Sequence, residues 1–199
     1  MTAALPKNRY LVFFAIATLG CLIDLTTKRW VFDWLGPPGP SSRVYWLWPG
    51  YVGFQTSLNE GALFGFGQGK VFLFAALSVV AAIGIPVWLF YGRAANDWLL
   101  CIALACVTAG VFGNLYDRLA LHGLTWHVPP HMGEPVHAVR DFVLLQLSDR
   151  FRWPNFNVAD SMLVCGAALL LWHALHPPAV APPDDAAAGD SHNSSADAN

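Results

Sequence analysis

The stretch from Val71 to Tyr91 runs for 21 residues without one charged side chain. As a helix it would be about 30 Å long, which matches the hydrocarbon thickness of a bilayer. Across all 199 residues, 55% are hydrophobic and only 12% are charged. Soluble domains carry roughly 25% charged residues, so the composition also favours an integral membrane protein.

Three more apolar runs are long enough to cross a membrane, at about 10–34, 98–121 and 157–175. Together with 71–91 they predict a membrane all-α fold, with four transmembrane helices in a single domain over residues 1–176. Four spans joined by short connections would place both termini on the same side of the membrane. Residues 177–199 have the composition of a disordered acidic tail.

Local signals predict where these helices end, bend and begin. Gly36 and the prolines after it cannot continue the first helix. Pro86 is expected to kink the second span, which a membrane helix tolerates. Asn96 or Asp97 is suited to cap the third helix.

The connections also contain strand signals. Residues 44–48 and 51–58 are rich in aromatic and β-branched residues and are separated by Pro49-Gly50. They predict short strands of a small sheet on the membrane surface, within a surface region at about 44–65. Residues 139–147 are expected to form another strand, and residues 149–154 an interfacial turn.

The N-terminal residues and the loop charges allow more than one interpretation. Lys7 and Arg9 precede an apolar run, as in a signal peptide, but further spanning segments follow Cys21, so we favour a first transmembrane helix. A positive-inside count would place the termini outside, because the other side carries more basic residues. These are Lys28, Arg29, Arg43, Lys70, Arg118, Arg140, Arg150 and Arg152.

Cysteine and histidine placement argues against a metal or disulfide framework. The four cysteines all lie in apolar runs, which is typical of small buried residues (Cys21, Cys101, Cys106 and Cys165). Four histidines in the irregular segment 121–139 raise a metal hypothesis, but their spacing is loose (His122, His127, His131 and His137). The net charge of −2 and the lack of a basic cluster exclude a nucleic-acid partner.

Polar residues at the borders of the apolar runs are the strongest functional signal. Asp141 and Asp160 flank a short polar connector at the start of the last span. A carboxylate at membrane depth is costly, so it indicates function by default. Two converging carboxylates could share a proton and perform acid–base chemistry on a peptide bond.

Simpler interpretations exist for most of the polar residues at these borders when each is taken alone, but not for Asp141. Asp160 is placed to interact with a helix dipole, and Asn59–Gly65 reads as a plain turn. Asp24 and Lys28 lie four apart and can form an interfacial ion pair. Asp117 and Arg118 fit a charge pair that snorkels to the membrane edge.

Five short motifs, in order, resemble those of the lipoprotein signal peptidase (signal peptidase II) family. They are Asp24…Lys28, Asn59-x-Gly-Ala-x-Phe-Gly65, Gly113-Asn-x-x-Asp-Arg118, Val139-x-Asp-Phe142 and Phe156-Asn-x-Ala-Asp160. The resemblance implies an intramembrane aspartyl peptidase of the bacterial inner membrane, with an extracytoplasmic sheet and cytoplasmic termini. It also implies a prolipoprotein substrate whose cysteine carries diacylglycerol, with cleavage just before that cysteine.

The resemblance assigns residues as well. The family's catalytic pair matches Asp141 and Asp160. Its supporting or substrate-contacting positions match Asp24, Lys28, Asn59, Gly61, Asn114, Asp117, Arg118, Asn157 and Ala159. It implies a monomer with no metal or organic cofactor. The chain departs from the family at Leu63, where a small residue is more usual, and in a longer connection from Arg118 to Asp141.

Two other classes of function compete with a peptidase. A small transporter or proton-relay protein would use Asp24, Asp117, Asp141 and Asp160 as a polar path, and would be expected to carry internal repeats, which the sequence lacks. A non-catalytic helper of other membrane proteins would tolerate the loss of either Asp141 or Asp160.

Overall fold

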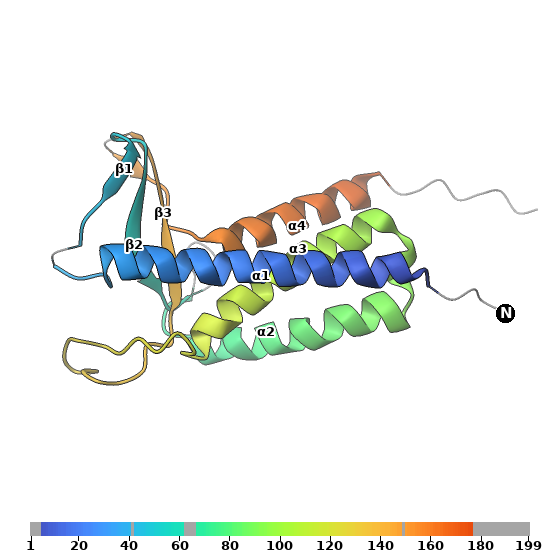
Figure 1. The fold of residues 1–199 in the computed structure, drawn as a ribbon, viewed down its shortest axis with the longest axis horizontal. Coiled ribbons are helices and arrows are strands. Elements are labelled where there is room, and N and C mark those ends of the chain that lie inside the picture. Colours follow the sequence, from blue (N-terminus) through green and yellow to red (C-terminus); the bar gives the residue numbers. More distant parts are fainter. Residues whose placement is uncertain (1–4, 41, 62–66, 149, 177–199) are drawn as a thin grey trace, which may run out of the picture.

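The computed structural model describes residues 5–40, 42–61, 67–148 and 150–176. Within these ranges a helical bundle carries a small sheet across one end (Figure 1). The helices are α1 (Lys7–Leu35), α2 (Val71–Pro86), η2 (Val87–Tyr91), η3 (Ala94–Asn96), α3 (Trp98–Arg118) and α4 (Val158–Leu175). The strands are β1 (Tyr45–Trp48), β2 (Val52–Asn59), β3 (Val139–Ser148) and β4 (Phe151–Arg152). The tail predicted at 177–199 lies outside the described residues.

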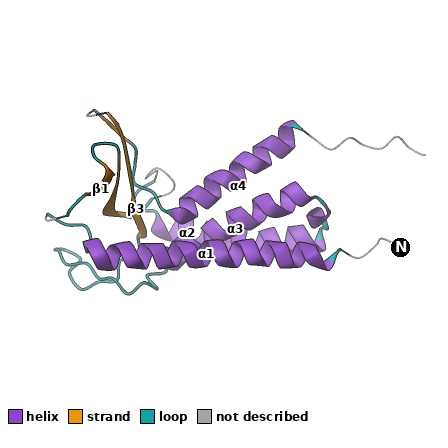
Figure 2. Ribbon diagram, turned by 45° about the horizontal axis from the view of Figure 1, so that its top comes forward, coloured by secondary structure: helices purple, strands orange, loops and turns teal. Residues whose placement is uncertain are grey.

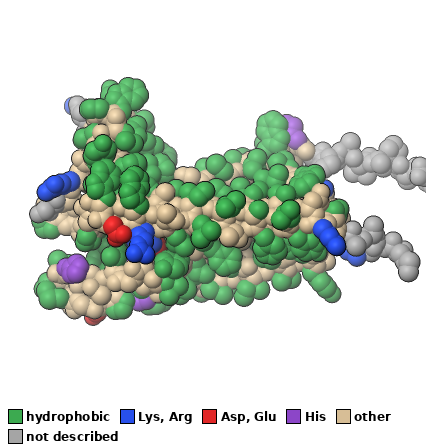
Figure 3. Space-filling view, in the orientation of Figure 1, with side chains coloured by type: hydrophobic (Ala, Val, Ile, Leu, Met, Phe, Trp, Pro, Cys, Tyr) green, Lys and Arg blue, Asp and Glu red, His purple; other side chains and the backbone are tan. Residues whose placement is uncertain are grey.

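Among the described residues, four helical segments are long and apolar enough to span a membrane. They are α1, α2 continued by η2, α3 and α4, which confirms the predicted membrane fold. The start of α1 and the end of α4 lie at the same end of the bundle, opposite the sheet (Figure 1). Hydrophobic side chains cover the visible face of the bundle, and charged groups gather toward its two ends (Figure 3).

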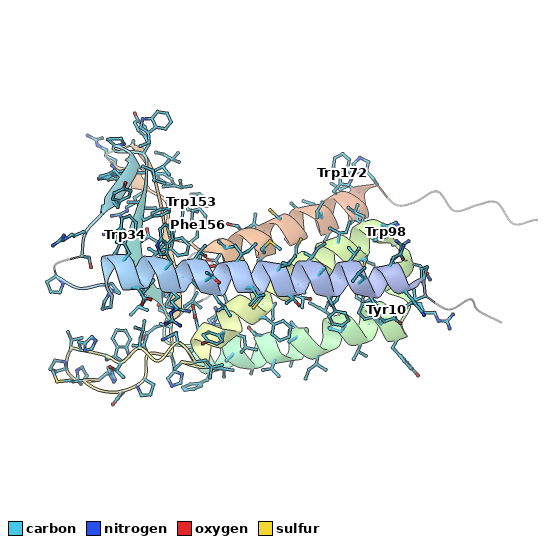
Figure 4. The ribbon with its side chains drawn as sticks, viewed as in Figure 1. Tyr10, Trp34, Trp98, Trp153, Phe156 and Trp172 are labelled. Carbon is cyan, nitrogen blue, oxygen red and sulfur yellow. The ribbon has the colours of Figure 1, made fainter. Side chains whose placement is uncertain are left out.

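Aromatic side chains mark both ends of the bundle (Figure 4). Trp34, Trp153 and Phe156 lie at the sheet end, and Tyr10, Trp98 and Trp172 lie at the other end. Trp and Tyr rings, which have an apolar body and a polar tip, favour the two membrane–water interfaces. Their positions therefore bracket the part of the bundle that lies in the hydrocarbon.

Helix α3 contacts each of the other three spanning segments, and glycines permit its closest approaches. A Cβ added at Gly110 would lie 2.6 Å from Leu163 Cγ on α4, and one at Gly113 would meet the Asp24 carboxylate on α1. On α4, a Cβ at Gly166 would lie 2.7 Å from Val107 Cγ2. Gly110 and Gly113 thus allow the neighbouring helices to come close to α3.

Two helix boundaries differ from the sequence prediction. Pro86, where the sequence predicted a kink, ends the α-helical part of α2, and the next five residues continue the span as a π-helix. Helix α3 begins after the N-cap Asp97, as predicted, but ends at Arg118 rather than near 121. The left-handed backbone of Ala120 (φ 56°) stops it there.

The strands form an antiparallel sheet in the order β1-β2-β3-β4, which stands across the end of the bundle (Figure 2). Strand β3 pairs with β2, so that Asp141 lies opposite Ser57. The predicted turn at 149–154 is partly wrong, because Phe151–Arg152 returns as β4 and pairs with β3. The sheet thus delivers Asp141 to the end of the bundle.

The connection from α3 to β3, which the structure describes throughout, contains no helix or strand, as predicted, although local pairing holds it together. Its two sides pair, with Val136 N–H donating to Leu124 O at 3.0 Å and Trp126 N–H donating to Glu134 O at 2.9 Å. His131 bonds Glu134, and His137 bonds Arg118 O. Within the described ranges, no group of three or more His, Cys, Asp or Glu side chains is placed to hold a metal.

The cysteines do not all follow the expectation of burial. Cys101 is buried, whereas Cys165 is exposed on the outer surface of α4, where lipid would surround it. All four cysteines fall inside the described ranges and are free thiols. An apolar span can place a cysteine on its lipid-facing side, because a small, weakly polar thiol is tolerated by lipid as well as by the protein interior.

Candidate active site

Asp141 and Asp160 converge on one side chain, Asn157. Its amide Nδ2 donates to Asp141 Oδ1 at 2.6 Å, and its Oδ1 accepts from the Asp160 backbone N–H at 2.9 Å. All three residues are buried, with Asp141 1% and Asp160 8% exposed. One strand and one helix start therefore bring together carboxylates that are 19 positions apart in the sequence.

Asp160 is held by the N-terminus of α4. Asn157 is the N-cap, and the Asp160 carboxylate accepts back from the Asn157 N–H, completing a capping box. Asn114 of α3 donates Nδ2 to the other carboxylate oxygen at 2.8 Å. The helix dipole and these donors stabilise a negative charge on Asp160. The interpretation of Asp160 as only a helix-dipole partner is wrong, since Asn114 and Asn157 tie it to the rest of the site.

Asp141 lies in a different environment. It sits on β3 beside the side-chain amides of Asn157 and Asn59, both of which hydrogen-bond it. Burial away from water, and then the nearby charge of Asp160, raise the pKa of Asp141 to about 8. The two carboxyls are both buried and lie close together, so the pair is suited to hold one proton between them.

Lys28 lies at the centre of a buried network beneath this pair. Its Nζ is 2.8 Å from Asp24 Oδ2 and 3.2 Å from Asp117 Oδ2, and it donates to Asn114 Oδ1 at 3.0 Å. Lys28, Asp24 and Asp117 have no exposed surface. The predicted Asp24–Lys28 pair is confirmed, but its interpretation as an interfacial pair at a helix end is wrong.

Asp117 anchors the strand that carries Asp141. Its Oδ1 accepts from Arg140 Nε and Nη2 at 3.1 and 2.8 Å, and its Oδ2 accepts from the Arg140 backbone N–H at 3.0 Å. The interpretation of Asp117 and Arg118 as a charge pair snorkelling to the membrane edge is wrong. Asp117 faces inward and fixes β3 one residue before Asp141.

Asp24 anchors the helix that carries Asp160. Its Oδ1 accepts from the backbone N–H of Ala159 in the first turn of α4 at 2.8 Å. The Cβ of Ala159 also packs where a Cβ on Gly113 would collide with it. Asp24 and Asp117 therefore each hold the backbone next to one of the two aspartates, and Lys28 joins them.

Arg118 and Asn59 close the site on the side of the loop after β2. Arg118 Nη2 donates to Gly61 O at 3.0 Å, and Asn59 Oδ1 accepts from the Gly61 N–H at 2.9 Å. The charge of Arg118 acts on Asp141 and Asp160. The rest of the motif predicted here, including Leu63, lies outside the described residues.

Every predicted site residue thus belongs to one connected cluster. Sequence reasoning left Arg140 out of the site, although it binds Asp117 through three N–H groups. The signal available in the sequence was an arginine directly before Asp141, together with an aspartate, Asp117, that would need a partner at membrane depth. Gln68, which donates to Asn59 Oδ1 at 3.2 Å, gave no signal in the sequence.

The arrangement suits acid–base hydrolysis better than nucleophilic or metal chemistry. One carboxyl is set up to donate a proton and the other to accept one, which is the division of labour that such hydrolysis needs. Backbone anchors on both sides keep the two groups in place. The site lies where the sheet meets the helices, at the edge of the hydrocarbon.

Comparisons with known proteins agree on one family. The sequence model described as "Signal peptidase (SPase) II" matches residues 16–176. A lipoprotein signal peptidase of Rhodopirellula baltica is 48% identical over 169 residues, covering 85% of this chain and 74% of that protein. A lipoprotein signal peptidase of Pseudomonas fluorescens is 38% identical over 127 residues, covering 61% of this chain and 65% of that protein.

Solved structures add a likeness of fold. One, described as a bacterial membrane enzyme at 2.3 Å resolution, has a TM-score of 0.66 and 22% identity, and covers 86% of this chain and 90% of its own. A second, at 1.9 Å resolution, has a TM-score of 0.64 and the same identity. The bundle with its sheet is therefore an architecture already seen in membrane enzymes.

Proposed function

This chain belongs to the signal peptidase II family of membrane proteases, and we propose that it removes signal peptides from prolipoproteins by means of Asp141 and Asp160. The proposed substrate is a precursor whose cysteine already carries diacylglycerol. The proposed cut is at the peptide bond just before that cysteine. The relatives' name, lipoprotein signal peptidase, supports this class of substrate.

The observation that carries the proposal is the junction at Asn157. This one side chain bonds Asp141 and the backbone of Asp160, so it sets the two carboxyls beside each other. A substrate anchored in the bilayer by its lipid would present its scissile bond at this depth. No residue outside the chain and no cofactor is needed for the proposed steps.

The first half of the reaction adds water to the scissile carbonyl. Ionised Asp160 takes a proton from water, the oxygen attacks the carbonyl carbon, and protonated Asp141 gives its proton to the carbonyl oxygen. The product is a neutral tetrahedral diol. Asn114 and the α4 N-terminus support the charge on Asp160 before attack.

The second half breaks the carbon–nitrogen bond. Asp160 returns its proton to the leaving nitrogen, while Asp141 takes a proton from one diol hydroxyl as the carbonyl re-forms. The enzyme is then back in its starting protonation state, with one proton on the pair. The products are the signal peptide with a free carboxyl end and the lipoprotein with a free amine on its lipidated cysteine.

The test uses detergent-solubilised protein and a diacylglyceryl-modified precursor. Wild type should shift the precursor on a gel, and mass spectrometry of the products should place the cut before the lipidated cysteine. Asp141→Asn and Asp160→Asn should each lower the rate at least about 100-fold. Asp33→Asn is the matched control, because Asp33 is an exposed carboxylate at the same end of the bundle.

Unchanged activity of the two aspartate variants would contradict the proposal. If both variants fold and keep wild-type rates, the two aspartates do not form the catalytic pair. A proton-relay function would then be favoured, and it would show as proton uptake into proteoliposomes that depends on Asp117 and Asp141. An inert wild type on lipidated precursor would contradict the proposed substrate.

The proposed setting is the bacterial inner membrane, with a monomer whose termini are cytoplasmic and whose active site faces the extracytoplasmic side. The family resemblance supports this orientation against the raw charge count. Arg150→Cys should react with a membrane-impermeant thiol reagent added to spheroplasts, and Arg93→Cys should not. The reverse labelling pattern would invert the orientation.

A further inference from the structure

Two neighbouring cavities lie on the side of the bundle formed by α1 and α2. The deeper one, here called the apolar groove, has a volume of about 620 Å³ and runs between α1, α2 and α3. Phe14 and Leu22 of α1, Pro86 of α2 and Phe112 of α3 line it. In Figure 1 these helices are seen with α1 in front and α3 crossing behind.

At the sheet end the groove meets a polar cavity of about 450 Å³, here called the arginine pocket. Leu25 and Tyr116 line both cavities, so the two adjoin each other. The pocket is also lined by Arg29, Asp33, His122 and Arg140. An apolar groove therefore lies next to a chamber whose charged residues are two arginines and one aspartate.

The apolar groove extends along α1 past the middle of the bilayer. From Phe13 to Leu25 the groove follows α1 for 12 residues, or about 18 Å at 1.5 Å per residue. Half of a hydrocarbon core is about 15 Å. Arg29 lies one helical turn beyond Leu25, and the stacked rings of Trp30 and Trp34 mark the interface at that level.

The pocket is separate from the candidate active site. Arg140 and Asp141 are consecutive on β3, so their side chains point to opposite faces of the sheet. Neither Asp141 nor Asp160 lines the groove or the pocket. A substrate lying across the two aspartates would therefore lie on the other side of β3.

The charged side chains of the arginine pocket indicate which chemical group it can bind. Arg29 pairs with Asp33 at 3.5 Å, but the two side chains are 82% and 73% exposed, so this pair is weak and Arg29 can turn to another anion. Arg140 is fixed by Asp117 and still has further N–H donors on its five-donor guanidinium. Two arginines suit a phosphate, whereas an uncharged diacylglyceryl group would offer them ester oxygens but no anionic partner.

We propose that the apolar groove and the arginine pocket together bind one anionic glycerophospholipid, with its acyl chains along α1 and its phosphate at Arg29 and Arg140. The bound lipid belongs to the leaflet at the sheet end of the bundle. The lipid lies on the face of β3 that carries Arg140, and the aspartate pair lies on the face that carries Asp141. Its binding does not depend on the proposed peptidase reaction.

The test measures lipid retained by the full-length protein in native mass spectrometry, after release from bicelles of equal phosphatidylglycerol and phosphatidylcholine. Wild type should keep one phosphatidylglycerol in preference to phosphatidylcholine. Arg29→Gln should lower that retention about fivefold, which is the effect of one basic residue near an anionic lipid. Arg150→Gln, an equal charge change at the same end but outside the pocket, should leave retention unchanged.

A second pair of variants tests the groove. Thr18→Trp fills the groove from α1 and should abolish retention, whereas Leu19→Trp, on the neighbouring exposed position outside the groove, should not. Equal retention of the two lipids, or equal losses in Arg29→Gln and Arg150→Gln, would overturn the proposal. Displacement of the lipid, one for one, by a diacylglyceryl peptide would overturn it as well, by assigning the groove to substrate.

Discussion

Helix α1 carries two ion pairs of the same spacing but opposite burial, and they should differ sharply in their effect on stability. Asp24–Lys28 joins atoms 2.8 Å apart with both side chains fully buried. Arg29–Asp33 joins atoms 3.5 Å apart with side chains 82% and 73% exposed. Asp24→Asn and Asp33→Asn each remove one negative charge from the same helix while keeping the shape of the side chain.

The structure sets the expected size of each effect. Breaking a buried pair leaves an uncompensated charge and costs about 3–5 kcal/mol. Lys28 keeps Asp117 and Asn114 as partners, so the lower end, about 3 kcal/mol, applies to Asp24→Asn. An exposed i,i+4 pair contributes about 0.3–0.5 kcal/mol, so Asp33→Asn should be nearly silent.

Thermal unfolding in detergent measures the difference. For a chain of this size 1 kcal/mol corresponds to about 2–4 °C, so Asp24→Asn should lower Tm by roughly 6–12 °C. A thiol-reactive dye can report unfolding through the fully buried Cys101, once the exposed Cys165 has been replaced by alanine in every variant compared. Equal Tm shifts in the two variants would refute the argument that the Lys28 network is held by buried charge.

Three further outcomes follow from the same contacts. Asn157→Ala should cost about 1 kcal/mol as a lost N-cap and lower the cleavage rate at least about tenfold, because it unlinks Asp141 from α4. Asn155→Ala is the control, since the Asn155 amide donates to Gln55 O outside the site, and equal activity of the two variants would contradict this role of Asn157. Cleavage should fall as pH rises through about 8, since burial and the charge of Asp160 raise the pKa of Asp141 and the reaction needs its proton; a rate profile that is flat from pH 6 to 10 would exclude this role. Asp97→Ala should destabilise α3 by about 1 kcal/mol, because Asp97 Oδ1 accepts from the Leu100 N–H. That hydrogen bond lowers the pKa of Asp97, so its contribution to stability is present above about pH 4 and is lost as pH falls through the lower pKa of the folded state. A Tm difference between variant and wild type that persists at pH 2 would contradict this role of Asp97.

Much of the fold could be predicted from local sequence signals. The uncharged run at 71–91 and the capping residue Asp97 each depend on a short window of chain, and the structure places a spanning helix and a helix start there. Helix ends were less predictable. The end of α3 depends on the backbone conformation of Ala120, which residue type alone does not determine.

The candidate site was less accessible, because its parts come from distant windows. The sequence singled out four aspartates as costly carboxylates, but Asp24, Asp117 and Asp160 each had a simpler interpretation when taken alone, and only Asp141 did not. Arg140 escaped notice because its partner Asp117 lies 23 residues earlier, and pairing at that distance depends on how β3 crosses the end of α3. Its burial of 95% could be known only from packing.

By itself the sequence determined that this chain enters a membrane and that its carboxylates are costly there, since hydrocarbon length and charge content are properties of the chain alone. Tertiary structure alone decided that Lys28 joins the anchors of β3 and α4, and that Asn157 links Asp141 with Asp160. The physical reason is that burial and hydrogen bonding between distant segments exist only after the helices have packed. The same packing places Arg140 behind Asp141 and creates the lipid-shaped cavity on the opposite side of the strand.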